Sequence, residues 1–393
     1  MAGPMKGVRI VELGTMIAVP AATHLLATQG AEVVKIENVA GGDDLRRYGS
    51  SRDGMSGWFA NANAGKRAIA VDLAADAGRD IVLDLIERAD VFVQGYRPGS
   101  VDRLGLGYDA ASARNPRLVY VSASGFGADG PYAGRPVYDP IIQAVGGWAG
   151  GQTLADGSPS LVRGMVADKV AAMTVAQAIS AALVGRAAHG EGQHVEVSML
   201  EANLAFNWPD VMMHETVLAE DALHLPNLLG SYRLFQCQDG WVSLAAGNDR
   251  QWGSFCQACE RDDLASDDRF SSPQLRAQHF TEWYDTIGDM VRPWKRHDLI
   301  ERCVALEVPI APVYAPSEVV DDPQVRHREA ILEREHPVIG RYRTPRQGAR
   351  FGRDATETPS PAPGHGEHTD ELLAELGYDG ARIAELRDAG TVG

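Results

Sequence analysis

Runs of aliphatic residues alternate with helical patterns along the first 208 residues of this chain, and this alternation limits the folds that it can adopt. Strands that are apolar on both faces belong to parallel sheets that are covered by helices on both sides. Such sheets bind ligands at the carboxyl ends of their strands. The sequence therefore predicts an α/β fold, with strands expected at 7–14, 31–37, 66–73, 90–96, 115–127 and from residue 192.

The pattern changes near residues 209–229, which are irregular and form the expected linker between domains. Beyond them, two strands joined by a turn at Asp239 and Gly240, followed by several helices, predict a smaller α+β domain at 230–325. A surface linker rich in Pro and Gly then leads to a final helix. Thr369 is expected to be the N-cap of that helix.

The formal net charge of -16 limits the partners of the chain. Nucleic acids and membrane surfaces attract cationic proteins, so we expect neither of them as a partner. A few arginines can still form a local pocket for an anionic ligand. No apolar run approaches the roughly 18 residues of a membrane-spanning helix, and the N-terminus lacks the layout of a signal peptide.

Four cysteines in 393 residues do not make a disulfide framework, and a reducing, cytoplasmic location fits them best. Cys256 and Cys259 form a C-x-x-C pair inside a helical pattern, with no second pair and no histidine cluster nearby. We interpret them as ordinary helix cysteines. We therefore expect no metal site and no tightly bound cofactor.

Gly125, Gly127 and Gly130 match the G-x-G-x-x-G pattern of dinucleotide-binding loops, directly after an expected strand. That function needs a helix to begin at the loop, so that the helix N-terminus faces the pyrophosphate. Pro131 and Pro136 follow instead, and no helix is expected there. We therefore interpret the glycines as a flexible loop on the substrate side rather than as an NAD site.

Asp168 stands at the start of a long helical pattern, at 168–190. An aspartate at this place is typical of a helix N-cap. A helix N-terminus also favours the ionised carboxylate that a nucleophile requires. The residues alone favour the cap, and the two roles are compatible.

Eight segments of the chain, in order, resemble the family III coenzyme A-transferases, the group of the formyl-CoA and carnitine-CoA transferases. The α-methylacyl-CoA racemases share the fold and many of these segments. The resemblance extends over essentially the whole chain, at 9–37, 63–73, 89–108, 115–132, 137–147, 165–183, 192–202 and 366–377.

The resemblance implies a Rossmann-like large domain built from both chain ends, 1–208 and 326–393, with the smaller domain between them. It also implies a homodimer whose two chains are interlocked. Asp168 falls at the position of the family's nucleophile. In that role its carboxylate attacks an acyl-CoA thioester, and CoA passes to a free carboxylic acid through an aspartyl anhydride and an aspartyl-CoA thioester.

The resemblance also assigns residues to a CoA site in the loops that follow the strands. Arg97 and Arg103 are expected to meet phosphate or adenine, because a guanidinium offers a planar fork and a stacking face. Gly247 and Asn248 are expected in a lid over the acyl site, although a plain helix cap by Asn248 fits as well. The other expected CoA contacts are Ile17, Ala18, Asn38, Val71, Asp72, Leu73, Gly95, Tyr96 and Tyr138.

Tyr138 helps to separate a transferase from a racemase. The racemases place a histidine at this position, as half of an acid–base pair that removes and returns the α-proton. Tyrosine is a poor substitute at neutral pH, and transferases of the family carry tyrosine here. Formyl-CoA transferases have Gln at the position of Ile17 and Arg at that of Asn38, so we do not expect formyl or oxalate substrates.

We therefore expect an acyl-CoA:carboxylate CoA-transferase that uses Asp168, with an acyl-CoA and a carboxylic acid as substrates. A 2-methylacyl-CoA racemase is the alternative enzyme, and a non-catalytic acyl-CoA-binding protein is the alternative from another class. Core packing is the common fate of large apolar residues. Candidates for an apolar acyl pocket are nevertheless Met16, Ile17, Trp148, Phe206 and Trp208.

Overall fold

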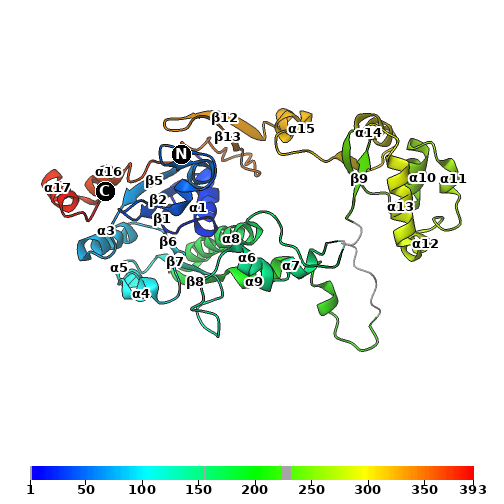
Figure 1. The fold of residues 1–393 in the computed structure, drawn as a ribbon. Helices are drawn as coiled ribbons and strands as arrows, with labels where there is room; N and C mark the ends of the chain where they lie inside the picture. Colours follow the sequence, from blue (N-terminus) through cyan, green and yellow to red (C-terminus); the bar gives the residue numbers. More distant parts are fainter. Residues whose placement is uncertain (1, 155, 223–231) are drawn as a thin grey trace. The chain divides into compact units, whose positions relative to one another are not determined.

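The computed structural model of the chain describes residues 2–154, 156–222 and 232–393. These residues form two compact units (Figure 1). The first combines Met1–Glu220 with Glu329–Gly393, and the second is Asp221–Arg328. Part of the expected linker at 209–229, from residue 223 onward, lies outside the described residues. The domain boundaries inferred from the sequence stay predictions.

A parallel six-stranded sheet forms the centre of the first unit, as the apolar runs predict. Its strand order is β5-β2-β1-β6-β7-β8. In chain order among these six strands this is 3-2-1-4-5-6, the Rossmann order, with its switch point between β1 and β6. The strands are β1 (Arg9–Leu13), β2 (Glu32–Glu37), β5 (Lys66–Ala70), β6 (Val91–Gln94), β7 (Val119–Ser124) and β8 (Gln193–Ser198).

Helices cover both faces of this sheet, so its strands are apolar on both sides. On one face, Phe92 and Tyr120 pack with α3 (Asp76–Glu87), α5 (Tyr108–Arg114) and the C-terminal helices. On the other face, Ile10 and Val121 pack with α1 (Ala18–Thr28) and α8 (Val166–His189). The predicted α/β fold is confirmed.

The C-terminal segment runs along the β5 edge of the sheet, where it supports the loop after β5. The backbone N–H of Asp72 donates to the carbonyl of Thr391 at 2.8 Å. The single final helix expected from the sequence is wrong, because Gly377 has a φ of 101° and divides it into α16 (Thr369–Leu376) and α17 (Gly380–Asp388). Thr369 is the first helical residue rather than the N-cap, and its hydroxyl accepts from the N–H of Ala70.

Helix α8 is long and apolar enough, by length and composition, to cross a membrane. The sequence did not suggest this, because Asp168, Lys169 and Arg186 interrupt the apolar run near its ends. Val175 and Ile179 of α8 are fully buried in the hydrophobic cluster between the sheet and α1. One face of α8 therefore packs in the core, while 33% of its apolar stretch is buried in all and Met173 and Val184 are exposed.

Shorter elements complete the first unit. Most of them surround the carboxyl ends of the strands or extend the C-terminal segment. They are η1 (Asp44–Arg47), β3 (Ser51–Arg52), β4 (Met55–Ser56), α2 (Gly57–Asn63), α4 (Ser100–Arg103), α6 (Asp139–Val145), α7 (Trp148–Gly151), α9 (Met199–Asn207), η2 (Met213–Glu215), β12 (Ile331–His336) and β13 (Gly340–Pro345).

The second unit packs helices on a three-stranded antiparallel sheet, in the order β11-β10-β9. Cys256 and Cys259 lie in its hydrophobic core as free thiols, and burial raises the pKa of both. They act there as small hydrophobic residues. The elements are β9 (Leu234–Cys237), β10 (Gly240–Leu244), α10 (Asp249–Ala258), α11 (Asp262–Ala265), α12 (Pro273–Gln278), α13 (Phe280–Val291), α14 (Arg296–Ala305), β11 (Ile310–Pro312), η4 (Val319–Asp321) and α15 (Pro323–His327).

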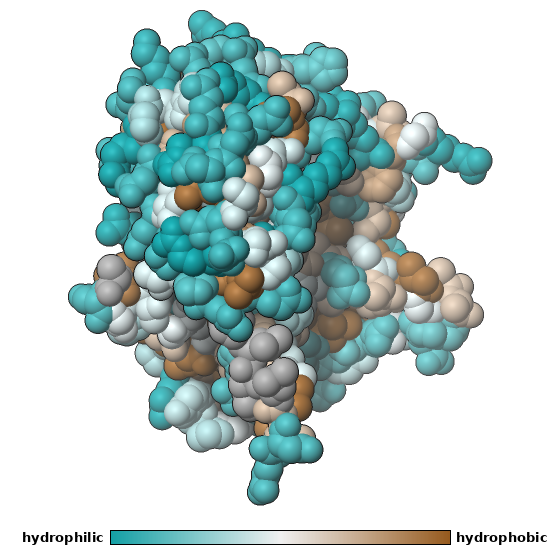
Figure 2. Space-filling model, turned by 90° about the vertical axis from the view of Figure 1, so that its right-hand side faces the viewer, coloured by the Kyte–Doolittle hydropathy of each residue, from teal (hydrophilic) through white to brown (hydrophobic). Residues whose placement is uncertain are grey.

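Hydrophilic residues dominate the face drawn in Figure 2, where hydrophobic residues form small separate patches. Many surface charges are paired, for example Arg341 with Glu333 at 2.6 Å. Exposed pairs of this kind stabilise a fold by only about 0–1 kcal/mol each. The charges with structural consequences are therefore the buried ones, and those of Glu12, Lys35, Asp43 and Lys66 lie behind the loop that follows β1.

Two helical glycines of the first unit, one in α3 and one in α8, provide a matched test of how closely these helices are packed. A Cβ at Gly78 in α3 would lie 2.0 Å from the backbone oxygen of Asp72, whereas a Cβ at Gly185 in α8 would meet only side-chain ends, at 3.4 Å or more. We expect Gly78→Ala to lower the free energy of unfolding by about 1–3 kcal/mol. Gly185→Ala should raise it by about 0.5–1 kcal/mol. Urea unfolding measures both, and equal stability of the two variants would contradict the packing described.

Candidate active site

A cavity of about 940 Å³ opens at the carboxyl ends of the central strands, next to the switch point of the sheet. Its walls come from the loop after β1, the ends of β6 and β7, and the start of α8. This volume is in the range of small-molecule sites, and the position is the one where open α/β sheets bind ligands. The lining is largely apolar, with Ile17, Val137, Leu161 and Met165 among its residues.

Asp168 lies in the first turn of α8 and lines the cavity. Helix α8 begins at Val166, and Met165 occupies the N-cap position without a side-chain cap. The N-cap role that the residues alone favoured for Asp168 is therefore wrong. Its carboxylate faces the cavity instead, where it is available for chemistry.

The environment of Asp168 disfavours its ionised form. Burial, together with the nearby carboxylate of Asp139, raises the pKa of Asp168 to about 7. The N-terminal end of α8 acts in the opposite direction, because its free amides favour negative charge. The result is a carboxyl group that changes charge near neutral pH, and carboxyl groups with raised pKa values gather at functional sites.

Asp139 and Gln143 connect the start of α6 to the start of α8. One oxygen of Asp139 accepts from the backbone N–H of Asp168 at 3.0 Å, and the other accepts from Gln143 at 2.6 Å. The amide of Gln143 also binds the backbone of Val162 and Gly164, in the segment that leads into α8. Both side chains are buried, so this pair fixes the backbone that carries Asp168.

The sequence did not single out Gln143. The available signal was a pair of polar residues four positions apart, at Asp139 and Gln143, in an otherwise apolar helix. Residues at this spacing lie on one face of a helix. A polar pair on the buried face of a helix has to find partners inside the protein.

Most of the expected CoA contacts line one of two neighbouring hollows. Ile17, Ala18, Gly95 and Tyr138 line the large cavity. A smaller hollow of about 260 Å³ shares Thr15 with the large one. It is lined by the expected contacts Asn38, Val71, Asp72, Leu73 and Tyr96. Both hollows are lined by the loops that follow the carboxyl ends of the strands. An extended ligand could therefore lie along these loops.

Arg97 and Arg103 line neither hollow. Both are exposed, and the guanidinium of Arg103 donates to the hydroxyl of Ser100 at 3.2 Å. Lys169 is the one cationic side chain among the described residues that line the large cavity. It follows Asp168 directly and is exposed.

The proposed lid residues lie in the second unit. Asn248 caps α10, because its side chain accepts a hydrogen bond from the N–H of Gln251 at 2.8 Å. The carbonyl of Gly247 accepts a hydrogen bond from the guanidinium of Arg276. The cap interpretation of Asn248 is thus confirmed, and a lid role for the two residues stays a prediction. No group of three or more His, Cys, Asp or Glu among the described residues could hold a metal ion.

Two further sequence interpretations can be compared with the structure. No helix begins after the glycine motif until α6 at Asp139, which confirms that this loop does not have the dinucleotide-binding geometry. Trp148 and Phe206 stack on each other with ring centroids 5.7 Å apart, and neither they nor Trp208 line the cavity. Of the proposed acyl-pocket residues, Met16 and Ile17 do line it.

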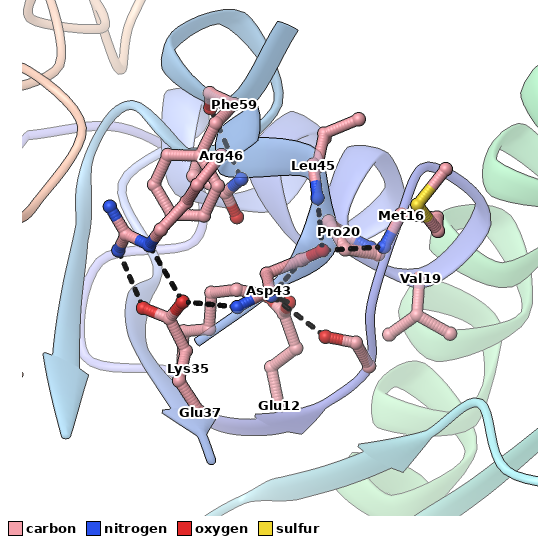
Figure 3. Close-up of polar contacts among 12 residues, drawn as sticks. Glu12, Met16, Val19, Pro20, Lys35, Glu37, Asp43, Leu45, Arg46 and Phe59 are labelled. Carbon is pink, nitrogen blue, oxygen red and sulfur yellow. Dashed lines mark hydrogen bonds and ion pairs between the residues drawn. The ribbon is translucent and has the colours of Figure 1, made fainter. Parts of the chain in front are cut away.

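Buried charges lie directly behind the loop that follows β1 (Figure 3). Glu12 binds Lys35 at 2.9 Å and Lys66 at 2.7 Å, and all three side chains are fully buried. Burial alone would raise the pKa of Glu12, but the two ammonium groups outweigh it and lower this pKa. The sequence interpretation missed this cluster, although its signal was present as charged residues inside otherwise apolar strands.

The fold is an α/β fold with a Rossmann-order sheet, and a carboxyl group lines the cavity at its switch point. The chain matches the description "CoA-transferase family III" over residues 5–369, and it belongs to this family. The predicted family is confirmed. The chain is therefore an acyl-CoA:carboxylate CoA-transferase, and the racemase and non-catalytic alternatives are not supported.

Named relatives and solved structures agree with this assignment. The chain is 32% identical to a succinate–glutarate CoA-transferase of Agrobacterium fabrum, over 95% of this chain and 96% of the relative. It is 33% identical to a succinyl-CoA:mesaconate CoA-transferase of Haloarcula hispanica, over 95% and 97% of the two chains. A crystal structure of a CAIB/BAIF family protein from Brucella suis is similar with a TM-score of 0.84 and 29% identity, covering 96% of this chain and 100% of the other.

The raised pKa of Asp168 can be measured directly. In protein with ¹³C-labelled aspartate carboxyl groups, the Asp168 signal should titrate with a midpoint near pH 7, well above an ordinary aspartate. Asp139→Asn removes a neighbouring negative charge, so the midpoint should move to lower pH. The Asp168→Asn variant identifies the signal. A midpoint near 4 in the unmodified protein would contradict the described environment.

Proposed function

We propose that the chain transfers CoA from an acyl-CoA thioester to a free carboxylic acid through covalent intermediates on Asp168. The observation that carries this proposal is the position of the Asp168 carboxyl group in the wall of a large apolar cavity, at the carboxyl edge of the sheet. Direct attack of one carboxylate on a thioester in water is slow. An enzyme carboxylate divides the transfer into easier steps.

In the first half of the reaction, a carboxylate oxygen of Asp168 attacks the thioester carbon of the donor. The carbon–sulfur bond breaks and the CoA thiolate leaves, so that a mixed anhydride joins Asp168 to the acyl group. The thiolate then attacks the Asp168 carbonyl carbon of the anhydride. The donor acid leaves as a carboxylate, and CoA is now bound to Asp168 as a thioester.

In the second half, the acceptor carboxylate attacks the Asp168–CoA thioester and releases the thiolate again. The thiolate attacks the acceptor's carbonyl carbon in the new anhydride, which gives the product acyl-CoA and the free carboxylate of Asp168. No proton is gained or lost over the cycle. The largely apolar walls of the cavity support this sequence, because water would hydrolyse the anhydride.

Asp168→Asn tests the nucleophile with little change in shape. We expect the variant to lose transfer activity by at least about a thousandfold, because an amide cannot form the anhydride. Its thermal stability should not fall. Steady-state assays with an acyl-CoA and a panel of acids measure the loss.

Asp76→Asn is the matched control, because Asp76 also lies in the first turn of a helix, α3, but outside the cavity. This variant should keep its transfer rate. An Asp168→Asn protein that transfers CoA at the unmodified rate would contradict the proposed mechanism.

We further propose that the acceptor is a dicarboxylic acid. Several similar enzymes are named for succinate, glutarate, malate or mesaconate. The cation of Lys169 beside Asp168 supports this choice, because it offers a partner for a second carboxylate inside an apolar cavity. A monocarboxylic acid has no second carboxylate that could pair with this cation.

Lys169→Met should therefore change the choice of acceptor. An exposed ion pair gives up to about 1 kcal/mol, so the KM for glutarate should rise up to about fivefold while the KM for butyrate stays unchanged or falls. Lys6→Met, an exposed lysine ahead of the amino-terminal end of β1, serves as the control. Equal effects on both acids would show that Lys169 does not recognise the second carboxylate.

The remaining features of the enzyme are proposals of the same kind. CoA would lie along the two hollows as a substrate, without a tightly bound cofactor. A homodimer, interlocked as the resemblance implies, would cover the large apolar side chains that are exposed on α6, α8 and α9. These are Ile141, Val145, Met173, Val184 and Phe206. Four buried, free cysteines support a reducing, cytoplasmic location.

A further inference from the structure

The loop from Gly14 to Ile17 connects β1 to α1, and its residues Thr15, Met16 and Ile17 line the same cavity as Asp168. Met16 has a φ of 64°, in the left-handed region. Residues other than glycine are strained there and persist only where the surrounding structure holds them. Such strain is often found at ligand sites. The contacts that hold this loop are therefore relevant to the substrate.

Two buried side chains hold the backbone of the loop from behind (Figure 3). The ammonium group of Lys35 donates to the carbonyl of Gly14 at 2.7 Å. The carboxylate of Asp43 accepts from the N–H of Met16 at 3.1 Å. Lys35 and Asp43 also form an ion pair at 3.0 Å, so the two contacts on the loop are parts of one unit.

The position of Lys35 is anchored on its other side as well. Its ammonium group binds Glu12, and Asp43 in turn accepts from the N–H of Leu45 and donates its own N–H to Glu37. The backbone of Gly14 and Met16 is thus tied to rigid, buried groups on β1, β2 and η1. A shift of the loop would break hydrogen bonds to charged groups that have no access to water, which is costly.

Lys66 is the natural comparison for Lys35, because it belongs to the same cluster but has other partners. It is as buried as Lys35 and shares Glu12 with it, but its other partners are the carbonyl of Pro20 in α1 and the side chain of Asn63 in α2. Its hydrogen bonds go to Glu12, Pro20 and Asn63 and not to the loop of Gly14 and Met16. Buried ion pairs are weak evidence for stability as such, because apolar replacements can be as stable. The two lysines therefore differ in the elements that they bind: Lys35 binds the loop after β1, and Lys66 binds α1 and α2.

We infer that Lys35 and Asp43 are positioning residues for CoA transfer, which set the cavity wall formed by Gly14–Ile17 for the reacting thioester. The inference rests on the proposed reaction at Asp168. A displacement of about 1 Å in a reacting group can slow catalysis by about a hundredfold. The cluster thereby links the interior of the sheet to the geometry of the site.

The comparison of Lys35→Met with Lys66→Met tests this role. Both variants remove a buried ammonium group from Glu12, and both should lower the melting temperature. Well below the melting temperature of either variant, kcat for transfer should fall at least about tenfold in Lys35→Met and stay within about threefold in Lys66→Met. A merely structural role would lower both melting temperatures and leave the two kcat values alike, which would overturn the inference.

If Lys35→Met does not fold, two variants of Asp43 test the same inference. Asp43→Asn keeps an oxygen that can accept from Met16, whereas Asp43→Ala removes it. We expect Asp43→Ala to be about tenfold slower than Asp43→Asn, and equal rates would overturn the inference. An unmodified enzyme that transfers CoA without an Asp168 adduct would contradict the proposed mechanism, and the kcat comparison would still test the positioning role.

Discussion

The ion cluster of Glu12, Lys35 and Lys66 connects three adjacent strands of the central sheet inside the protein. Moving such charges out of water costs several kcal/mol per ion, which only good geometry and further hydrogen bonds offset. Here the offset comes from backbone carbonyls, Thr23 and Asp43. Lys35 and Asp43 bind the loop after β1, whereas Lys66 binds the carbonyl of Pro20 in α1. The cavity wall formed by Gly14–Ile17 therefore depends on Lys35 and Asp43.

The part of the cavity wall that carries Asp168 is held in a different way. Burial and the nearby carboxylate of Asp139 raise the pKa of Asp168. The Asp139–Gln143 pair fixes its backbone through hydrogen bonds rather than its carboxylate through an ion pair. The site therefore combines a rigid, charge-paired wall with a carboxyl group that is held in place but poorly solvated. A poorly solvated carboxylate is a better nucleophile than one held by a salt bridge.

Sequence patterns predicted the sheet because its strands are buried on both faces and consist of nearly continuous apolar runs. They did not reveal the ion cluster, because the pairing of Glu12 with Lys35 depends on the register between β1 and β2, where the two residues are direct neighbours. The nucleophile role of Asp168 was assigned from the resemblance, since the residues around Asp168 alone favoured an N-cap role. Arg97 and Arg103, which were expected to contact CoA, line neither hollow. The geometry of short connecting segments decides where such long side chains point, and the sequence pattern does not specify that geometry.

The proposed function depends on covalent transfer of the acyl group and of CoA through Asp168. The most direct measurement is intact-protein and peptide mass spectrometry after incubation with a panel of acyl-CoA thioesters, followed by hydroxylamine or borohydride treatment. The account predicts a CoA adduct that maps to Asp168, is cleaved by hydroxylamine and is absent from the Asp168→Asn variant. Turnover of the same thioesters with no adduct, or with an adduct on another residue, would contradict it.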